Sequence, residues 1–112
     1  MKNFLVLYQA PISAMEQMAS ATPEQAKAGM DAWMAWAQKA GKAVVDLGLP
    51  VGNGTSITKG AVAKGASKIA GYSILQAESM QAATALLEGH PHLHMPGASI
   101  EVLEGLPLPG MP

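Results

Sequence analysis

Apolar residues occupy both faces of the first stretch of the chain, Lys2–Gln9. Its alternating residues form two apolar sets, Phe4, Val6 and Tyr8 on one side and Leu5 and Leu7 on the other. A strand of this kind is typical of the middle of a sheet with both faces covered. Two predicted helices can cover only one face of a sheet, so we expect a partner subunit to cover the other.

A second alternating pattern runs through Ala70–Ala77 and predicts another strand. Ser79 follows as a helix N-cap, because its hydroxyl can accept a hydrogen bond from a free amide of the first turn of Met80–Glu88. Gly89 is suited to end this helix, since glycine readily adopts the left-handed conformation. Ala98–Leu103 then alternates again, as expected of a strand buried on one face.

Thr22 begins the longer predicted helix. It is placed as the N-cap, Pro23 takes the first helical position, and Gln25 can complete a capping box. Gly41 supplies the stop. The apolar face predicted to be buried comprises Ala26, Met30, Trp33, Met34, Ala37 and Ala40, with Trp36 at its margin.

The middle of the chain is rich in glycine and small residues. Lys42–Leu47 is predicted to be a strand, and Gly48–Gly54 a loop. Thr55–Lys59 has the composition of an edge strand or of one arm of a hairpin, and Gly60–Lys68 that of a connection. Ile12–Ser20 fits either a loop or one or two helical turns.

The predicted order is strand, helix, strand, hairpin-like excursion, strand, helix, strand. This is the split βαβ arrangement, an α+β, ferredoxin-like fold in which two helices lie on one face of an antiparallel sheet. At this length we expect one domain over residues 1–112, with residues 105–112 as a C-terminal tail.

Charge and composition exclude several kinds of partner. The net charge of -1 and a charged fraction of 13% leave no basic surface for nucleic acid or for an anionic membrane. The chain has no cysteine, signal peptide or membrane span, which indicates a soluble, cytoplasmic protein. The apolar fraction of 49% and eight methionines are high for so small a domain, and they favour an interface with another copy.

The three histidines, His90, His92 and His94, alternate in the segment before the last strand. An extended conformation would point all three imidazoles to one side. They could be solvated residues of a turn, ligand contacts or metal ligands. Because the spacing is not that of usual metal sites and no fourth ligand is evident, we predict no metal site and no cofactor.

Aromatic residues suggest where a ligand could bind. Tyr8, Trp33 and Trp36 could line a pocket between the first helix and the sheet, with the histidines at its mouth, although the same residues would also suit a core. We expect the turn to approach Tyr8 and Gln9, because the first and last strands of a split βαβ fold are neighbours. Asp46 is the carboxylate that could pair with a histidine, so the catalytic candidates are His90, His92 and Asp46.

Several segments together resemble the YCII-related (YciI-like, or DGPF) family of the dimeric α/β-barrel superfamily. They are MKNFLVLY, TPEQ, DAWMAWAQKAGKAVVDLG, GYSILQAES and GHPHLHMPGASIEVLEG, which span nearly the whole chain. The resemblance implies a ferredoxin-like domain whose open sheet face packs against the same face of a second subunit. Relatives carry Asp-Gly-Pro-Phe where this chain has Lys59-Gly60-Ala61-Val62, and the His–Asp pair proposed in some of them has no counterpart, since no histidine precedes His90.

Two functional classes follow from the sequence. The first is a homodimer that binds a small, largely apolar molecule, including the case of an enzyme that uses a histidine as acid or base. The second is a non-catalytic module whose apolar surface serves dimerisation alone.

Overall fold

The computed structural model describes residues 1–110, so the last two residues of the predicted tail lie outside the described range. In chain order the elements are β1 (Lys2–Gln9), α1 (Ala14–Ser20), α2 (Pro23–Ala40), the 3₁₀ turn η1 (Gly41–Ala43), β2 (Val44–Asp46), β3 (Thr55–Thr58), β4 (Ala61–Lys64), β5 (Ile69–Ala77), α3 (Met80–Leu86), the 3₁₀ turn η2 (Pro91–His94) and β6 (Ser99–Glu104).

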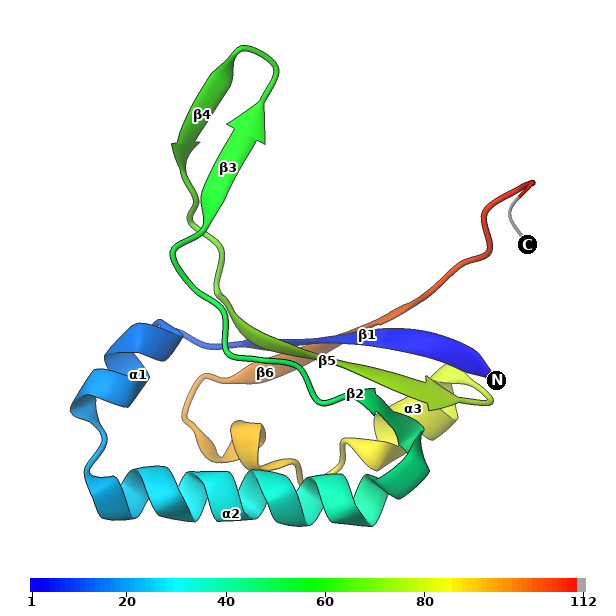
Figure 1. Cartoon of the computed structure of the whole chain (residues 1–112), viewed down its shortest axis with the longest axis horizontal. Coiled ribbons are helices and arrows are strands. Elements are labelled where there is room, and N and C mark those ends of the chain that lie inside the picture. The colour runs from blue at the N-terminus through cyan, green and yellow to red at the C-terminus, as the bar shows by residue number, and fades with distance from the viewer. Residues whose placement is uncertain (111–112) are drawn as a thin grey trace.

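The main sheet has the strand order β2-β5-β1-β6, and every neighbouring pair is antiparallel. Helices α2 and α3 lie on one face of this sheet (Figure 1). The order and the layers are those of a ferredoxin-like α+β fold, which confirms the predicted fold class. Strand β1 is central, as its doubly apolar pattern indicated.

The core lies between the sheet and the helices. Its buried members include Phe4, Val6 and Tyr8 from β1, Leu75 from β5 and Trp36 from α2. The opposite, outer face of the sheet has no layer over it in the single chain (Figure 1). There Leu5 pairs across the strands with Ile74 and Leu103, and Leu5 and Leu103 are 39% and 44% exposed.

Helix α2 begins with the predicted capping box between Thr22 and Gln25. The prediction of its buried face was partly wrong. Met30 and Met34 are exposed, whereas Trp36 is only 7% exposed. The reason is that helical periodicity fixes neither the centre of the buried face nor the turns that meet the sheet. Here the face that packs on the core is made by Trp33, Trp36, Ala37 and Ala40 in the second half of α2, which leaves Met30 before it and Met34 beside it.

The structure corrects the bounds of two predictions about the middle of the chain. The segment expected as a plain connection, Gly60–Lys68, contains β4, which pairs with β3 in a hairpin that stands away from the sheet (Figure 1). Lys42–Leu47 forms a strand only over Val44–Asp46, because the residues before it continue the helix as the η1 turn. The ambiguous segment Ile12–Ser20 contains α1, with Ser13 as its N-cap.

No helix among residues 1–110 is long and apolar enough to cross a membrane.

Candidate functional site

The histidine segment is a compact turn, not the extended conformation that would have pointed all three imidazoles to one side. Gly89 has a φ of 70°, which ends the α3 region and turns the chain, and Pro91–His94 then forms η2. Residues two apart share a side in a strand, but in a 3₁₀ helix, with about three residues per turn, they point in different directions. As a result His90 and His92 are buried and His94 is exposed.

His90 is fully buried within a ring of aromatic side chains. Its ring centroid lies 4.4 Å from that of Trp33, 4.5 Å from Trp36 and 5.0 Å from Tyr8. Both tryptophans meet the imidazole at steep interplanar angles of 85° and 64°, an edge-to-face arrangement that is favourable for aromatic rings. The structure thus places three of the predicted ligand-binding residues, Tyr8, Trp33 and Trp36, around the imidazole of a fourth, His90.

The hydrogen bonds of His90 define where its proton lies. Nδ1 accepts from the backbone N–H of His92 at 3.0 Å, so the proton of the neutral ring is on Nε2. Nε2 is buried and has no hydrogen-bond partner among the described residues. Burial, with smaller contributions from the charges of His92 and His94, lowers the pKa of His90 to about 4, so the ring is neutral at pH 7.

His92 ties the turn to the end of β1. Its Nε2 lies 2.8 Å from the backbone oxygen of Gln9, and because a carbonyl can only accept, this nitrogen carries the proton. The ring also meets Tyr8 at a centroid distance of 5.3 Å. The expected approach of the histidine turn to Tyr8 and Gln9 is therefore present in the structure.

A chain of hydroxyl groups lies beside the aromatic cluster. Ser73 Oγ donates to the backbone oxygen of Leu47 at 2.6 Å, which leaves its lone pairs to accept from Tyr8 Oη at 2.8 Å. Burial raises the pKa of Tyr8 to about 12, while the hydrogen bond to Ser73 opposes the shift. Tyr8 is therefore a neutral donor at physiological pH.

Sequence reasoning had missed Ser73. It lies on the buried face of β5, on the same side as Leu75 and Ala77. The available signal was a polar residue that shares a strand face with these two apolar residues. Trp36 is anchored in a similar way, because its Nε1 donates to the backbone oxygen of Leu86 at 2.8 Å and joins α2 to α3. These bonds make the walls of the cluster rigid.

Two predicted site residues lie elsewhere. Asp46 is on β2, at the opposite edge of the sheet from β6, and its Oδ1 accepts from the backbone N–H of Gly48 at 2.9 Å. His94 is exposed at the end of η2. Over residues 1–110 no histidine lies within 4.0 Å of a carboxylate, and no group of three potential metal ligands occurs. The pairing of Asp46 with a histidine that the sequence left open is not formed, and Asp46 is an exposed charge at the end of β2.

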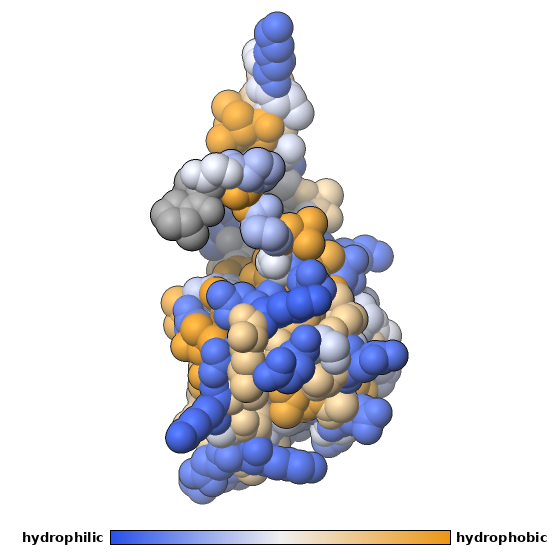
Figure 2. Space-filling model, turned by 90° about the vertical axis from the view of Figure 1, so that its right-hand side faces the viewer, coloured by the Kyte–Doolittle hydropathy of each residue, from blue (hydrophilic) through white to orange (hydrophobic). Residues whose placement is uncertain are grey.

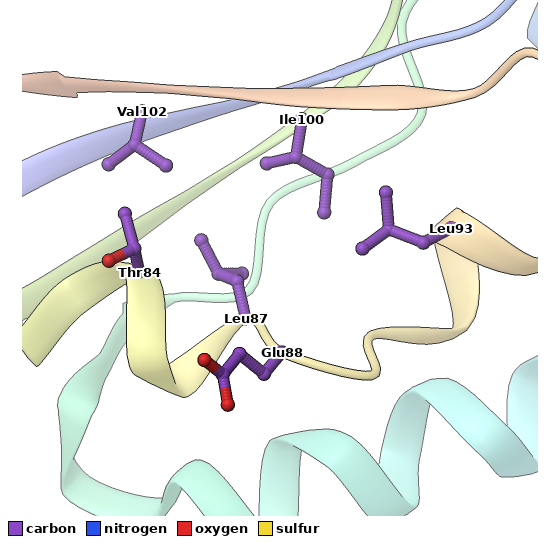
Figure 3. A pocket seen from close by; sticks show the side chains of 6 residues that line it. All are labelled: Thr84, Leu87, Glu88, Leu93, Ile100 and Val102. Atoms are coloured by element: carbon purple, nitrogen blue, oxygen red, sulfur yellow. The ribbon is translucent and has the colours of Figure 1, made fainter. Parts of the chain in front are cut away.

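A shallow groove of about 240 Å³ lies next to the histidine turn, between α3 and β6 (Figure 3). Its lining residues are Thr84, Leu87, Glu88, Leu93, Ile100 and Val102. Leu87, at the end of α3, and Ile100, on β6, point toward one another across the groove. Glu88 is the charged residue of the lining. A second hollow of about 120 Å³ lies beside Trp36 and Leu86. Of the aromatic cluster, only Trp36 lines either hollow, and neither is lined by His90.

No model of a known protein family matches the chain, and no curated protein matches it. Among solved structures, the chain is similar to 5-chloro-2-hydroxyhydroquinone dehydrochlorinase (TftG) from Burkholderia phenoliruptrix AC1100, in complex with 2,5-dihydroxybenzoquinone. The identity is 18%, the TM-score is 0.48, and the match covers 90% of this chain and 91% of the other. Similarity at this level transfers no property from one protein to the other, so the fold assigned above rests on the strand order of this chain.

Proposed function

We propose that this chain is a homodimeric domain of the dimeric α/β-barrel type, related to the YCII-like proteins, that holds a small, largely apolar molecule against His90. The observation that carries the binding proposal is the unpartnered Nε2–H of His90, fully buried among aromatic rings. An unsatisfied buried donor costs about 1–3 kcal/mol, and native proteins rarely leave one without a partner. A hydrogen-bond acceptor on a bound molecule would satisfy it.

The chemistry of the cluster suggests the class of ligand. Trp33, Trp36 and Tyr8 offer flat apolar surface. The donor left for a ligand is the Nε2–H of the neutral His90, because the Tyr8 hydroxyl already donates to Ser73. This combination suits a small aromatic or cyclic molecule with a carbonyl or hydroxyl acceptor. The same features favour His90 as a donor rather than as a general base, because a pKa near 4 makes it a weak proton acceptor at pH 7.

Dimerisation is supported by the outer face of the sheet. Besides Leu5 and Leu103, the partly exposed residues Leu7, Tyr72 and Ile74 lie on this face in register across three strands. These residues form an apolar patch, with Glu101 of β6 opposite Leu7 at its side, and an exposed apolar patch of this kind indicates an interaction surface. A second copy offers the same face, so the contact would be isologous and would close as a dimer.

Binding is tested by titrating the ¹⁵N-labelled protein with substituted phenols, and with toluene as a probe of similar shape that lacks an acceptor. We expect the Nε2 resonance of His90 to shift on binding a phenol and the fluorescence of Trp33 and Trp36 to change with the same midpoint. His90→Phe should weaken phenol binding by about 10-fold or more, which corresponds to the loss of one hydrogen bond in a buried site. His94→Gln is the matched control, since His94 is exposed.

If no phenol shifts the His90 resonance, and Nε2–H instead exchanges with a trapped water, the binding proposal is wrong. The chain would then be the non-catalytic dimerising module. The dimer itself is tested by sedimentation: Leu5→Glu should yield monomers, because a carboxylate cannot be buried without a partner in an apolar interface. A wild-type chain that sediments as a monomer at micromolar concentration would contradict the dimer.

A further inference from the structure

The β3–β4 hairpin is the part of the chain with the least support from its own fold. All eight of its strand residues are exposed, and the two strands pair only with each other. An isolated two-stranded hairpin is at best marginally stable in water, and three or more strands or a packed face are usually needed. A second surface that packs against it would account for its order.

One face of the hairpin carries an exposed apolar pair, with Thr55 and Lys64 beside it toward the base. Ile57 and Val62 form a directly opposed cross-strand pair and are 76% and 73% exposed. Ser56 and Ala63 are paired on the other face, which carries only small side chains. Figure 2 shows hydrophobic surface on this upright arm below a hydrophilic tip. The pair is therefore placed to contact another apolar surface.

The position of the arm indicates what that surface is. The hairpin rises on the side of the sheet away from α2 and α3, which is the side of the uncovered apolar face, and the C-terminal segment rises on the same side at the other end (Figure 1). That segment carries Leu106 and Leu108, which are 75% and 64% exposed. A body seated on the outer sheet face would lie between these two projections.

We infer that the β3–β4 hairpin is a dimerisation arm, whose Ile57–Val62 face packs on the second copy of the chain seated against the outer sheet face. The inference rests on the proposed homodimer and adds the arm to its interface. A second copy is favoured over another partner because the arm continues the same apolar surface, and a two-fold axis gives each copy an arm on the other. The tip residue Lys59 is a charge of the kind that discourages strand edges from pairing further.

The inference is tested first by mixing two protein samples. One carries a nitroxide on Ile57→Cys, a unique attachment point because the chain has no cysteine; the other is ¹⁵N-labelled and carries no nitroxide. We expect the nitroxide to broaden amide signals of the labelled copy in the mixed dimer. A dimer whose labelled copy shows no broadening would overturn the arm alone, whereas a wild-type monomer would overturn the arm and the proposed dimer together.

A double variant measures the contribution of the arm. Ile57→Ser with Val62→Ser should raise the dimer dissociation constant by at least about 100-fold, because it removes two branched apolar side chains from each of the two arms of the dimer. Ala61→Ser with Ala63→Ser introduces the same residue type on the opposite face and should change the constant less than about 3-fold. Equal effects of the two double variants would contradict a contact made through the Ile57–Val62 face.

Discussion

Lowering the pH from 7 to 5 should destabilise the folded chain through His90. The pKa of His90 is lowered from 6.5 in the unfolded chain to about 4 in the folded chain, mainly because the charged form would lose its hydration on burial. In this interval the unfolded state therefore binds more protons than the folded state. The contribution of His90 to the free energy of unfolding is fully present above about pH 6.5. It decreases as the pH falls and is gone below about pH 4.

The size of the effect follows from the two pKa values. The full shift corresponds to about 3 kcal/mol, of which about 2 kcal/mol is lost between pH 7 and pH 5. This is a large part of the stability of a small domain. Restricting the comparison to this interval leaves out most of the carboxylate titration, which occurs at lower pH.

The assay is urea unfolding at pH 7, 6 and 5 at one protein concentration, because a dimer links stability to concentration. We expect His94→Gln to lose as much stability as the wild type and His90→Phe to lose about 2 kcal/mol less. Equal losses in a folded His90→Phe and in the wild type would refute the reasoning. If that variant does not fold, the ring proton signals of His90 in the wild type decide, since they should not titrate above pH 5.

Three further predictions concern the stability of the fold. Ser73→Ala should cost about 1–3 kcal/mol in urea unfolding, because it leaves the buried hydroxyl of Tyr8 without its partner, and it should raise the pKa of Tyr8 in an ultraviolet titration. Gly48→Ala should prevent stable folding, as judged by circular dichroism, since its Cβ would clash with the backbone oxygen of Tyr72. Gly60→Ala, with open space around it, should cost only about 1–2 kcal/mol for its positive φ. Thr22→Ala should lower the midpoint of thermal unfolding by removing a capping bond worth about 1 kcal/mol.

Local patterns in the sequence determined the elements and their order. The alternation in Lys2–Gln9 and Ala70–Ala77 and the capping box at Thr22 depend only on residues close together in the chain. The structure has strands and a helix at these places. The strand order followed because few topologies connect such elements. The fold class could therefore be predicted without the structure.

The candidate site was predictable only in part. The approach of the histidine turn to β1 followed from topology. The burial of His90 and the exposure of His94 depended on the turn being 3₁₀ rather than extended. That choice is not visible in the local pattern, which fits both. Tertiary packing decided it, by closing Trp33 and Trp36 around His90.

Distance in the sequence explains the remaining differences. The bond between Tyr8 and Ser73 joins residues 65 positions apart, and nothing in either segment alone specifies it. Periodicity likewise showed which residues of α2 share a face, but only the placement of the sheet decided that Trp36 is buried and Met30 exposed. The sequence by itself determined the local conformations and the faces they present, and the tertiary structure decided which of those faces meet, because burial depends on contacts between segments far apart in the chain.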